Sequence, residues 1–282
     1  MIWMLYTILA IFFYTATNLL MRMLAVNSKN PRAFSFIFNL WGAGFAFLIF
    51  LSQPKQALIL PSVLIISLIL CAILLYSYFE RLQFYARREI EASTITILFR
   101  LAPAITFAAS ILILGEPFGL KKFLGFALVL FAAILVSYKK DAKIKFEKAF
   151  FITLACAIFL GLAWTIDRKI MSSGFSPQFY SLLIWILPLI FIYLPYIPKK
   201  DLRLEVSSGS WKIPLLAFFN VFGFFFQLKA LSLADASRVI PLVSVSTILT
   251  VLGGIIILKE KSNLKNKIIA GIIVFIGILL LG

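Results

Sequence analysis

Arg100 is the residue whose type and position say most about chemistry. It lies eight residues after Ala92, inside the otherwise uncharged stretch 92–114, so a helix would carry it about 12 Å from one end. A membrane's hydrocarbon layer is about 30 Å thick, and a charge near its centre normally faces a cavity or a partner. The planar guanidinium suits a carboxylate or a phosphate. We therefore predict that Arg100 binds substrate; a structural pair with Glu80, or snorkelling to an interface, is the alternative.

Four further polar residues fall at helical spacing. Asn220 and Gln227 are seven residues apart, as are Tyr76 and Gln83, and residues at this spacing share one helical face. Polar groups facing lipid would be left without partners. Both faces should therefore look into a helix bundle, where they line a cavity or hydrogen-bond to neighbouring helices.

Tyr14, Asn18 and Trp164 complete the polar or aromatic candidates for a binding site in the apolar stretches. Tyr14 and Asn18 are four residues apart, so they share a face. Trp164 could stack on a ligand or a cation, or it could anchor its helix at the membrane surface. We predict all three as substrate-binding.

Two prolines, Pro103 and Pro241, interrupt apolar stretches. Proline has no backbone N–H and bends a helix from within. Pro103 would leave the carbonyl of Phe99 free beside Arg100, where it could coordinate substrate or water. We predict that both prolines kink or gate their helices, although membrane helices also tolerate proline without any function.

Four acidic residues lie near the ends of apolar stretches. Glu80 and Asp167 are the best candidates for proton binding if transport is proton-coupled. Glu116 and Glu260 each lie beside lysines, which favours a structural role. The chain has no histidine, so facilitated diffusion or substrate exchange is an equally open mechanism.

The composition excludes a water-soluble protein. The 282 residues are 62% hydrophobic and 13% charged, against about 45–50% and 25% in soluble domains. The net charge is +16, but the basic residues lie between apolar runs, which indicates orientation in a membrane rather than binding of nucleic acid. Cys71 and Cys156 both lie in apolar stretches, which favours packing over a disulfide or a metal site. We expect no metal and no cofactor.

The apolar pattern predicts an all-α integral membrane protein with ten transmembrane helices. The predicted spans are residues 2–22, 33–53, 58–79, 92–114, 119–138, 149–167, 176–197, 212–230, 236–258 and 264–281. Loops after the odd-numbered spans hold 19 Lys and Arg, against 7 in the other loops. This bias places the linker 139–148 in the cytoplasm and both termini outside a cell membrane.

The chain also repeats itself. A shift of 144 residues aligns 92–122 with 236–266 and leaves ten of 31 positions identical, while Arg100 pairs with Ser244. We include Ser244 among the substrate-binding candidates for this reason. Five spans per half is an odd number, so the second half must be inverted relative to the first. The predicted organisation is a first repeat at 1–140, a basic linker at 141–148 and an inverted second repeat at 149–282.

The motifs within the repeat resemble those of the drug/metabolite transporter superfamily, in particular its EamA-like ten-helix branch. They are Ala92-Ser93, Pro103, Leu114-Gly115-Glu116 and Gly125, then Leu231 to Ser237, Leu258-Lys259-Glu260 and Gly271. One departure is Thr247, which stands where the second half should match Pro103. The resemblance implies permeation of small metabolites, often amino acids, frequently as export.

The sequence thus predicts a secondary transporter of a small polar metabolite, an amino acid or a related carboxylate, which works by alternating access around a midplane cavity. The alternative is a translocase of a lipid-linked or phosphorylated substrate. A membrane enzyme is disfavoured because the sequence has no histidine and no intramembrane carboxylate pair. A channel is disfavoured because one asymmetric arginine makes no ring of charge. With both halves in one chain a monomer could work, and a dimer stays open.

Overall fold

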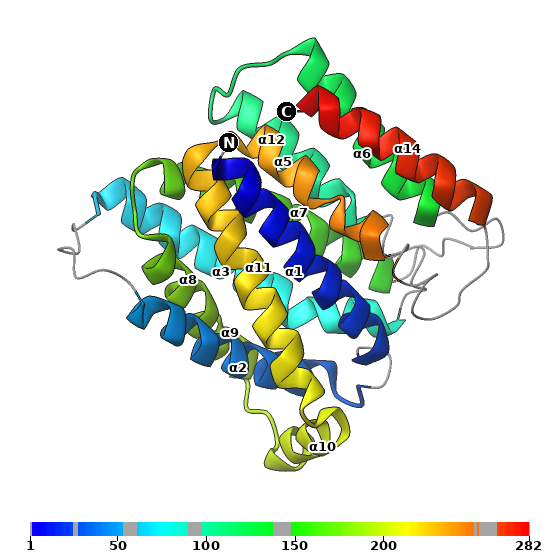
Figure 1. The fold of residues 1–282 in the computed structure, drawn as a ribbon. Helices are drawn as coiled ribbons and strands as arrows, with labels where there is room; N and C mark the ends of the chain where they lie inside the picture. Colours follow the sequence, from blue (N-terminus) through cyan, green and yellow to red (C-terminus); the bar gives the residue numbers. More distant parts are fainter. Residues whose placement is uncertain are drawn as a thin grey trace.

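The computed structural model describes residues 2–24, 28–52, 61–89, 98–137, 148–250, 253 and 264–281. Within these ranges the chain forms helices and no strand (Figure 1). The helices are α1 (Ile2–Leu24), α2 (Pro31–Leu51), α3 (Val63–Glu89), α5 (Leu101–Leu112), α6 (Leu120–Ser137), α7 (Lys148–Ser172), α8 (Pro177–Ile186), α9 (Pro188–Tyr193), α10 (Lys199–Gly209), α11 (Lys212–Leu233), α12 (Ala236–Val243) and α14 (Leu264–Leu281).

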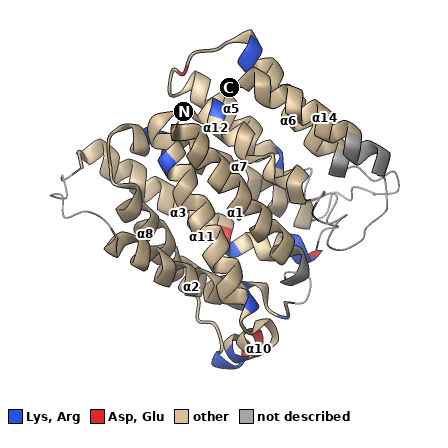
Figure 2. Cartoon of the chain, in the orientation of Figure 1, with Lys and Arg blue, Asp and Glu red and all other residues tan. Residues whose placement is uncertain are grey.

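Five of the described helices, α1, α2, α3, α7 and α11, are long and apolar enough to cross a membrane. Shorter apolar helices cover Leu101–Leu112, Pro177–Tyr193, Ala236–Thr250 and Ile269–Leu281. Charged residues lie mostly near helix ends and on α10, while most of the length of the helices is uncharged (Figure 2). This pattern fits elements that cross a hydrocarbon layer, in which charged side chains are costly.

Local sequence explains where several helices begin. The Asn30 side chain accepts hydrogen bonds from the backbone N–H groups of Arg32 and Ala33, and Pro31 opens α2. Ser176 caps α8 in the same way, ahead of Pro177. Such pairs satisfy or remove N–H groups that would otherwise lack partners at a helix start.

Three of the predicted spans are interrupted within the residues that the structure describes. In the span predicted at 92–114, residues 98–99 are helical, Arg100 is a turn and α5 begins at Leu101. The span predicted at 176–197 is divided into α8 and α9 where Pro188 begins the second piece. The span predicted at 236–258 starts as α12, which contains Pro241 and gives way to a turn at residues 244–245 before helical structure resumes at 246. The interruption lies on the C-terminal side of Pro241, whereas a proline removes the hydrogen bond to the carbonyl four residues before it.

Helices of the first half pack mainly on helices of the second. Helix α1 lies along α11 and α3 along α7, and α6 pairs with α14 at one side of the bundle (Figure 1). The sequence repeat equates α1 with α7 and α3 with α11, so the first two contacts are reciprocal. The contacts of α11 with α2, and of α3 with α8 and α9, follow the same exchange.

Small residues let some of these helices approach closely. A Cβ atom added at Gly161 of α7 would lie 2.7 Å from the carbonyl oxygen of Ala102 in α5. The Thr106 hydroxyl donates to the Gly161 carbonyl oxygen over 2.9 Å at the same crossing. Helices α6 and α14 meet at Gly125 and Gly277, while a Cβ at Gly271 would meet no atom within 4 Å.

Helix α10 is an addition that the sequence pattern did not predict. It follows α9 as a short polar helix, and its Glu205 is 1% exposed. The Glu205 carboxylate accepts the backbone N–H groups of Lys29 and Asn30, at 2.7 and 2.6 Å. This contact ties the loop after α9 to the start of α2.

Candidate functional site

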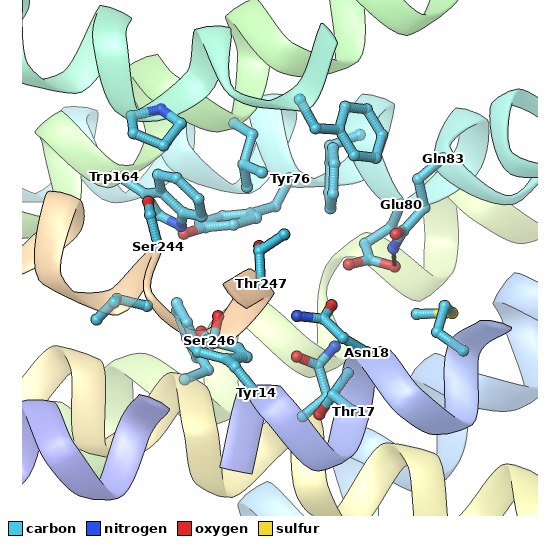
Figure 3. Close-up of a pocket in the computed structure, with 18 of the residues that line it drawn as sticks. Tyr14, Thr17, Asn18, Tyr76, Glu80, Gln83, Trp164, Ser244, Ser246 and Thr247 are labelled. Atoms are coloured by element: carbon cyan, nitrogen blue, oxygen red, sulfur yellow. Dashed lines mark hydrogen bonds between the residues drawn. The ribbon is translucent and has the colours of Figure 1, made fainter. Parts of the chain in front are cut away.

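A cavity lies between the two halves of the chain, lined by residues of α1, α2, α3, α5, α7, α8, α11 and α12 and of the turns beside α5 and α12. It offers about 170 Å³ to the centres of water-sized molecules. One water needs about 10–15 Å³ measured this way, so the space suits a solute of several heavy atoms. Figure 3 shows side chains from both halves converging on it.

One face of α3 supplies much of the polar wall. Tyr76, Glu80, Gln83 and Arg87 line the cavity at helical spacing. The Glu80 carboxylate accepts from Asn39 Nδ2 at 3.0 Å and from Gln83 Nε2 at 2.6 Å (Figure 3). Helix α3 runs to Glu89, past the predicted span end at 79. Glu80 therefore lies within the helix, where it is 8% exposed, and not near a span end as we expected.

Two guanidinium groups reach the same cavity. Arg100 lines it from the residue before α5, where its backbone is helical and its side chain makes no capping bond. Arg87 lines it from α3, with its guanidinium carbon 5.0 Å from the centre of the Phe99 ring. The arrangement offers two cations and one carboxylate to a single small space.

Most of the other predicted binding residues also line the cavity: Tyr14, Asn18, Trp164, Asn220 and Ser244. Gln227 does not. Its side chain is 0% exposed, and both of its polar atoms lack a hydrogen-bond partner among the described residues. Asn220 and Gln227 share one face of α11, but only Asn220 lines the cavity.

Asp167 lies behind the cavity wall. It is 0% exposed, and its carboxylate accepts from Tyr76 Oη and Tyr180 Oη, each at 2.6 Å. Tyr76 also lines the cavity, so one tyrosine connects the buried carboxylate with the open space. Helix α7 continues to Ser172, which puts Asp167 deeper in its helix than the predicted span, 149–167, implied.

The two prolines differ in their settings. Pro103 lines the cavity within the first turn of α5, where a missing N–H costs little. The chain is helical at residues 98–99 and forms a turn at Arg100, so an interruption precedes Pro103. Pro241 lies inside α12, beside a small apolar void that also touches Arg100 and Ser244.

The comparisons with known proteins agree with this architecture. The model of the EamA-like transporter family matches the chain twice, over residues 1–138 and 147–282. The chain belongs to the EamA-like transporter family. The suspected resemblance is thereby confirmed, and the protein is a multi-pass membrane protein of a transporter family.

The EamA-like fold is also found among solved structures. One, described as "Crystal structure of protein", has a TM-score of 0.74 at 12% identity, covering 98% of this chain and 94% of its own. Such low identity shows a shared fold and nothing about a shared substrate. No curated protein matches the sequence at a significant level.

Five polar residues at the EamA-like cavity were missed by sequence reasoning: Thr17, Asn39, Arg87, Ser246 and Thr247. Arg87 could have been found. The spacing from Tyr76 to Gln83 continues to Arg87, but the apolar run ends at 79, so this residue was counted as part of a loop. The three hydroxyl residues carried no comparable signal, because Ser and Thr are common in membrane helices.

We predicted structural roles for two glutamates, Glu116 and Glu260. Glu116 is 8% exposed and lies outside the cavity. We expected a structural pair with the lysines that follow it, or a role at a helix terminus. It contacts the start of α12 and Arg168, while Lys122 lies 3.3 Å from Asp235. Glu260 lies outside the described residues.

Proposed function

We propose that this EamA-like protein is a secondary transporter of an amino acid or a related small carboxylate. The observation that carries the proposal is the cavity itself. Arg87, Arg100 and Glu80 line one space that helices of both halves surround. Charged groups inside a membrane bundle are costly, and they are normally retained where they serve a substrate or ion path.

The charges suit a zwitterion or a small anion. A guanidinium binds a carboxylate through two parallel hydrogen bonds, and Arg87 and Arg100 are the two candidates. Glu80 can accept from an ammonium group. Asn18 and Asn220 add amides that can donate to or accept from a polar solute.

We propose that transport proceeds by alternating access, with the two five-helix halves inverted relative to each other. The reciprocal packing of α1 on α11 and of α3 on α7 supports this arrangement. Discontinuous helices beside the cavity also support it, since such helices commonly form the sites of transporters with inverted repeats.

The proposed orientation has the linker 139–148 in the cytoplasm and both termini outside. Two sets of contacts are consistent with it. Glu205, after the predicted seventh span, contacts Lys29 after the first. Arg168 and Asp235, after the sixth and eighth spans, lie 3.6 Å apart. Each contact joins loops that the Lys and Arg count assigns to one side of the membrane.

Counterflow in proteoliposomes tests the function. Purified protein is loaded with unlabelled amino acids, organic anions or phosphorylated metabolites, and tracer uptake is followed. We expect saturable exchange of a carboxylate-bearing solute. Arg100→Ala and Arg87→Ala should each raise the half-saturating concentration about tenfold to a hundredfold, because a hydrogen bond to a charged group contributes about 1.5–3 kcal/mol.

Arg88→Ala is the matched control. Arg88 neighbours Arg87 in sequence but is exposed and pairs with Glu89 at 2.8 Å, so its removal should leave exchange unchanged. Exchange that survives Arg87→Ala and Arg100→Ala would contradict their assignment as the anion site. Movement of only lipid-linked or phosphorylated substrates would overturn the proposed substrate class.

A further inference from the structure

Glu116 caps a helix that belongs to the other half of the chain. Its carboxylate accepts the backbone N–H groups of Ala236 and Ser237, at 2.8 and 3.0 Å, and the hydroxyl of Ser237. These are the first two residues of α12, whose own N-cap, Asp235, makes no side-chain capping bond. A carboxylate at this position satisfies unpaired N–H groups and complements the positive end of the helix dipole.

A network of charges surrounds this cap. Arg168, near the end of α7, has Nε 3.7 Å from Glu116 and Nη2 3.6 Å from Asp235, and its Nη1 donates to the Leu231 carbonyl over 2.6 Å. Lys122 of α6 lies 3.3 Å from Asp235 and 3.0 Å from the Ser237 hydroxyl. The network therefore joins α6, α7, the end of α11 and the start of α12.

The network lies at the opposite end of the helices from the cavity. Helix α5 begins beside the cavity residues Arg100 and Pro103 and ends just before Glu116. Helix α12 begins at the network and leads to the cavity residues Val243 and Ser244. The eight residues of α12 span about 12 Å, which sets the approximate separation between the two places.

The intervening part of α12 is packed. Val239 is 0% exposed, Ile240 1% and Leu242 3%. None of these side chains lines the cavity. The end of the bundle at Glu116 is therefore filled with apolar side chains behind the charged network, while the cavity extends along α3 toward Arg87.

The local backbone presents Glu116 to α12. Gly115 has φ +69°, a left-handed conformation that glycine adopts without strain. The Glu116 N–H then donates back to the Ser110 carbonyl over 3.1 Å. The carboxylate leaves the end of α5 already directed at a helix of the second half.

We propose that Glu116 is a positioning residue that locks α12 and so keeps the cavity closed at this end of the bundle. The lock joins the two halves, so they cannot separate at this end without breaking charge-assisted hydrogen bonds, which are stronger than neutral ones. Release of α12 opens a path from this membrane side to Ser244. The inference builds on the proposed transport function, because alternating access requires each end of the cavity to close and open.

Cysteine accessibility tests the lock without any substrate. The parent carries Ser244→Cys, with Cys71 and Cys156 replaced by alanine, and a membrane-impermeant maleimide is applied from each side of sealed vesicles. Glu116→Gln removes the charge and keeps the side-chain shape. We expect labelling from the Glu116 side to become about tenfold faster, with little change from the other side.

Glu205→Gln is the matched control, because Glu205 is also a buried carboxylate that accepts two backbone N–H groups. It should leave labelling from the Glu116 side unchanged. Arg168→Gln, which keeps the capping carboxylate, should give a smaller increase on the Glu116 side.

If Glu116→Gln does not fold, the labelling rates of Ser237→Ala and Arg168→Gln test the lock instead. Unchanged labelling in folded variants, or an equal increase on both sides, would overturn the lock. A positive result with no counterflow would keep the lock and reject the proposed substrates.

Discussion

At the scale of single residues, the two buried carboxylates have different relations to the cavity. Glu80 lines it and accepts hydrogen bonds from the neutral amides of Asn39 and Gln83. A substrate could replace these amides, or the carboxylate could bind a proton in their place. Asp167 is held by two tyrosine hydroxyls and lies behind the wall. Glu80 is therefore the better candidate for coupling transport to protons, and Asp167 the better candidate for fixing the position of Tyr76.

Glu80→Gln should separate coupling from exchange. Counterflow moves no net protons, so it should continue, with a higher half-saturating concentration if Glu80 also binds the substrate's ammonium group. Accumulation driven by a pH gradient should fall to the level seen without a gradient. Asp167→Asn should retain gradient-driven accumulation and lower thermal stability, because it replaces a charged acceptor for two buried hydroxyls. Parallel assays of both variants in proteoliposomes, with and without a gradient, measure this. Gradient-driven uptake by Glu80→Gln would contradict the assignment.

The sequence located many of the cavity residues because polar side chains are rare in its apolar stretches. Tyr14, Asn18 and Asn220 could be selected on that ground alone. Gln227 met the same criterion and lies elsewhere, since helical spacing indicates a shared face but not how far along its length that face borders a cavity. The partners of Asp167 were missed because Tyr76 is 91 residues away in sequence and Tyr180, 13 residues away, belongs to the next helix.

At the scale of helices, the crossing of α5 and α7 depends on the absence of a side chain at Gly161. A Cβ there would lie 2.7 Å from the Ala102 carbonyl oxygen and 2.8 Å from Ile105 Cβ. Gly161→Ala should force α5 away from α7 and displace Arg100 at the start of α5. Overpacking of this kind typically costs about 1–3 kcal/mol.

Thermal unfolding of the detergent-purified variant checks this prediction. Gly44→Ala is the control, since a Cβ at Gly44 would meet nothing within 4 Å. It should be neutral or slightly stabilising, because alanine favours helix by about 1 kcal/mol over glycine. Equal melting temperatures for Gly161→Ala and the parent would show that the crossing can relax.

Helix positions were largely predictable from apolar runs, but their continuity was not. The interruption at Pro188 lies inside the longest charge-free stretch, where hydropathy gives no sign of a break. For α3 the prediction ended the span too early, at residue 79, whereas the helix continues through Glu80 and Arg87. A hydropathy pattern ends at the first charges, whereas a helix continues wherever neighbouring helices cover those charges.

At the scale of the whole molecule, the proposed orientation predicts which exposed residues face each side. Ser207 lies on α10, after the predicted seventh span, and Ser173 follows α7. In a cysteine-free background, Ser207→Cys should react with an impermeant maleimide only in inverted membrane vesicles. Ser173→Cys should react in intact cells. The opposite pattern would reverse the orientation, and labelling of both from one side would contradict the count of spans between them.

The reciprocal packing of the two halves has a consequence for how the protein is made. The partner of α1 is α11, and that of α6 is α14. A ribosome adds about 5–20 residues per second, so α1 waits roughly 10–40 s in the bilayer before α11 is synthesised. During that time its contact surface faces lipid or an insertion factor. Helix α3 can find α7 first, and α6 remains without its partner until the final helix enters. The nascent chain thus acquires its complete structure only when its last residues leave the ribosome.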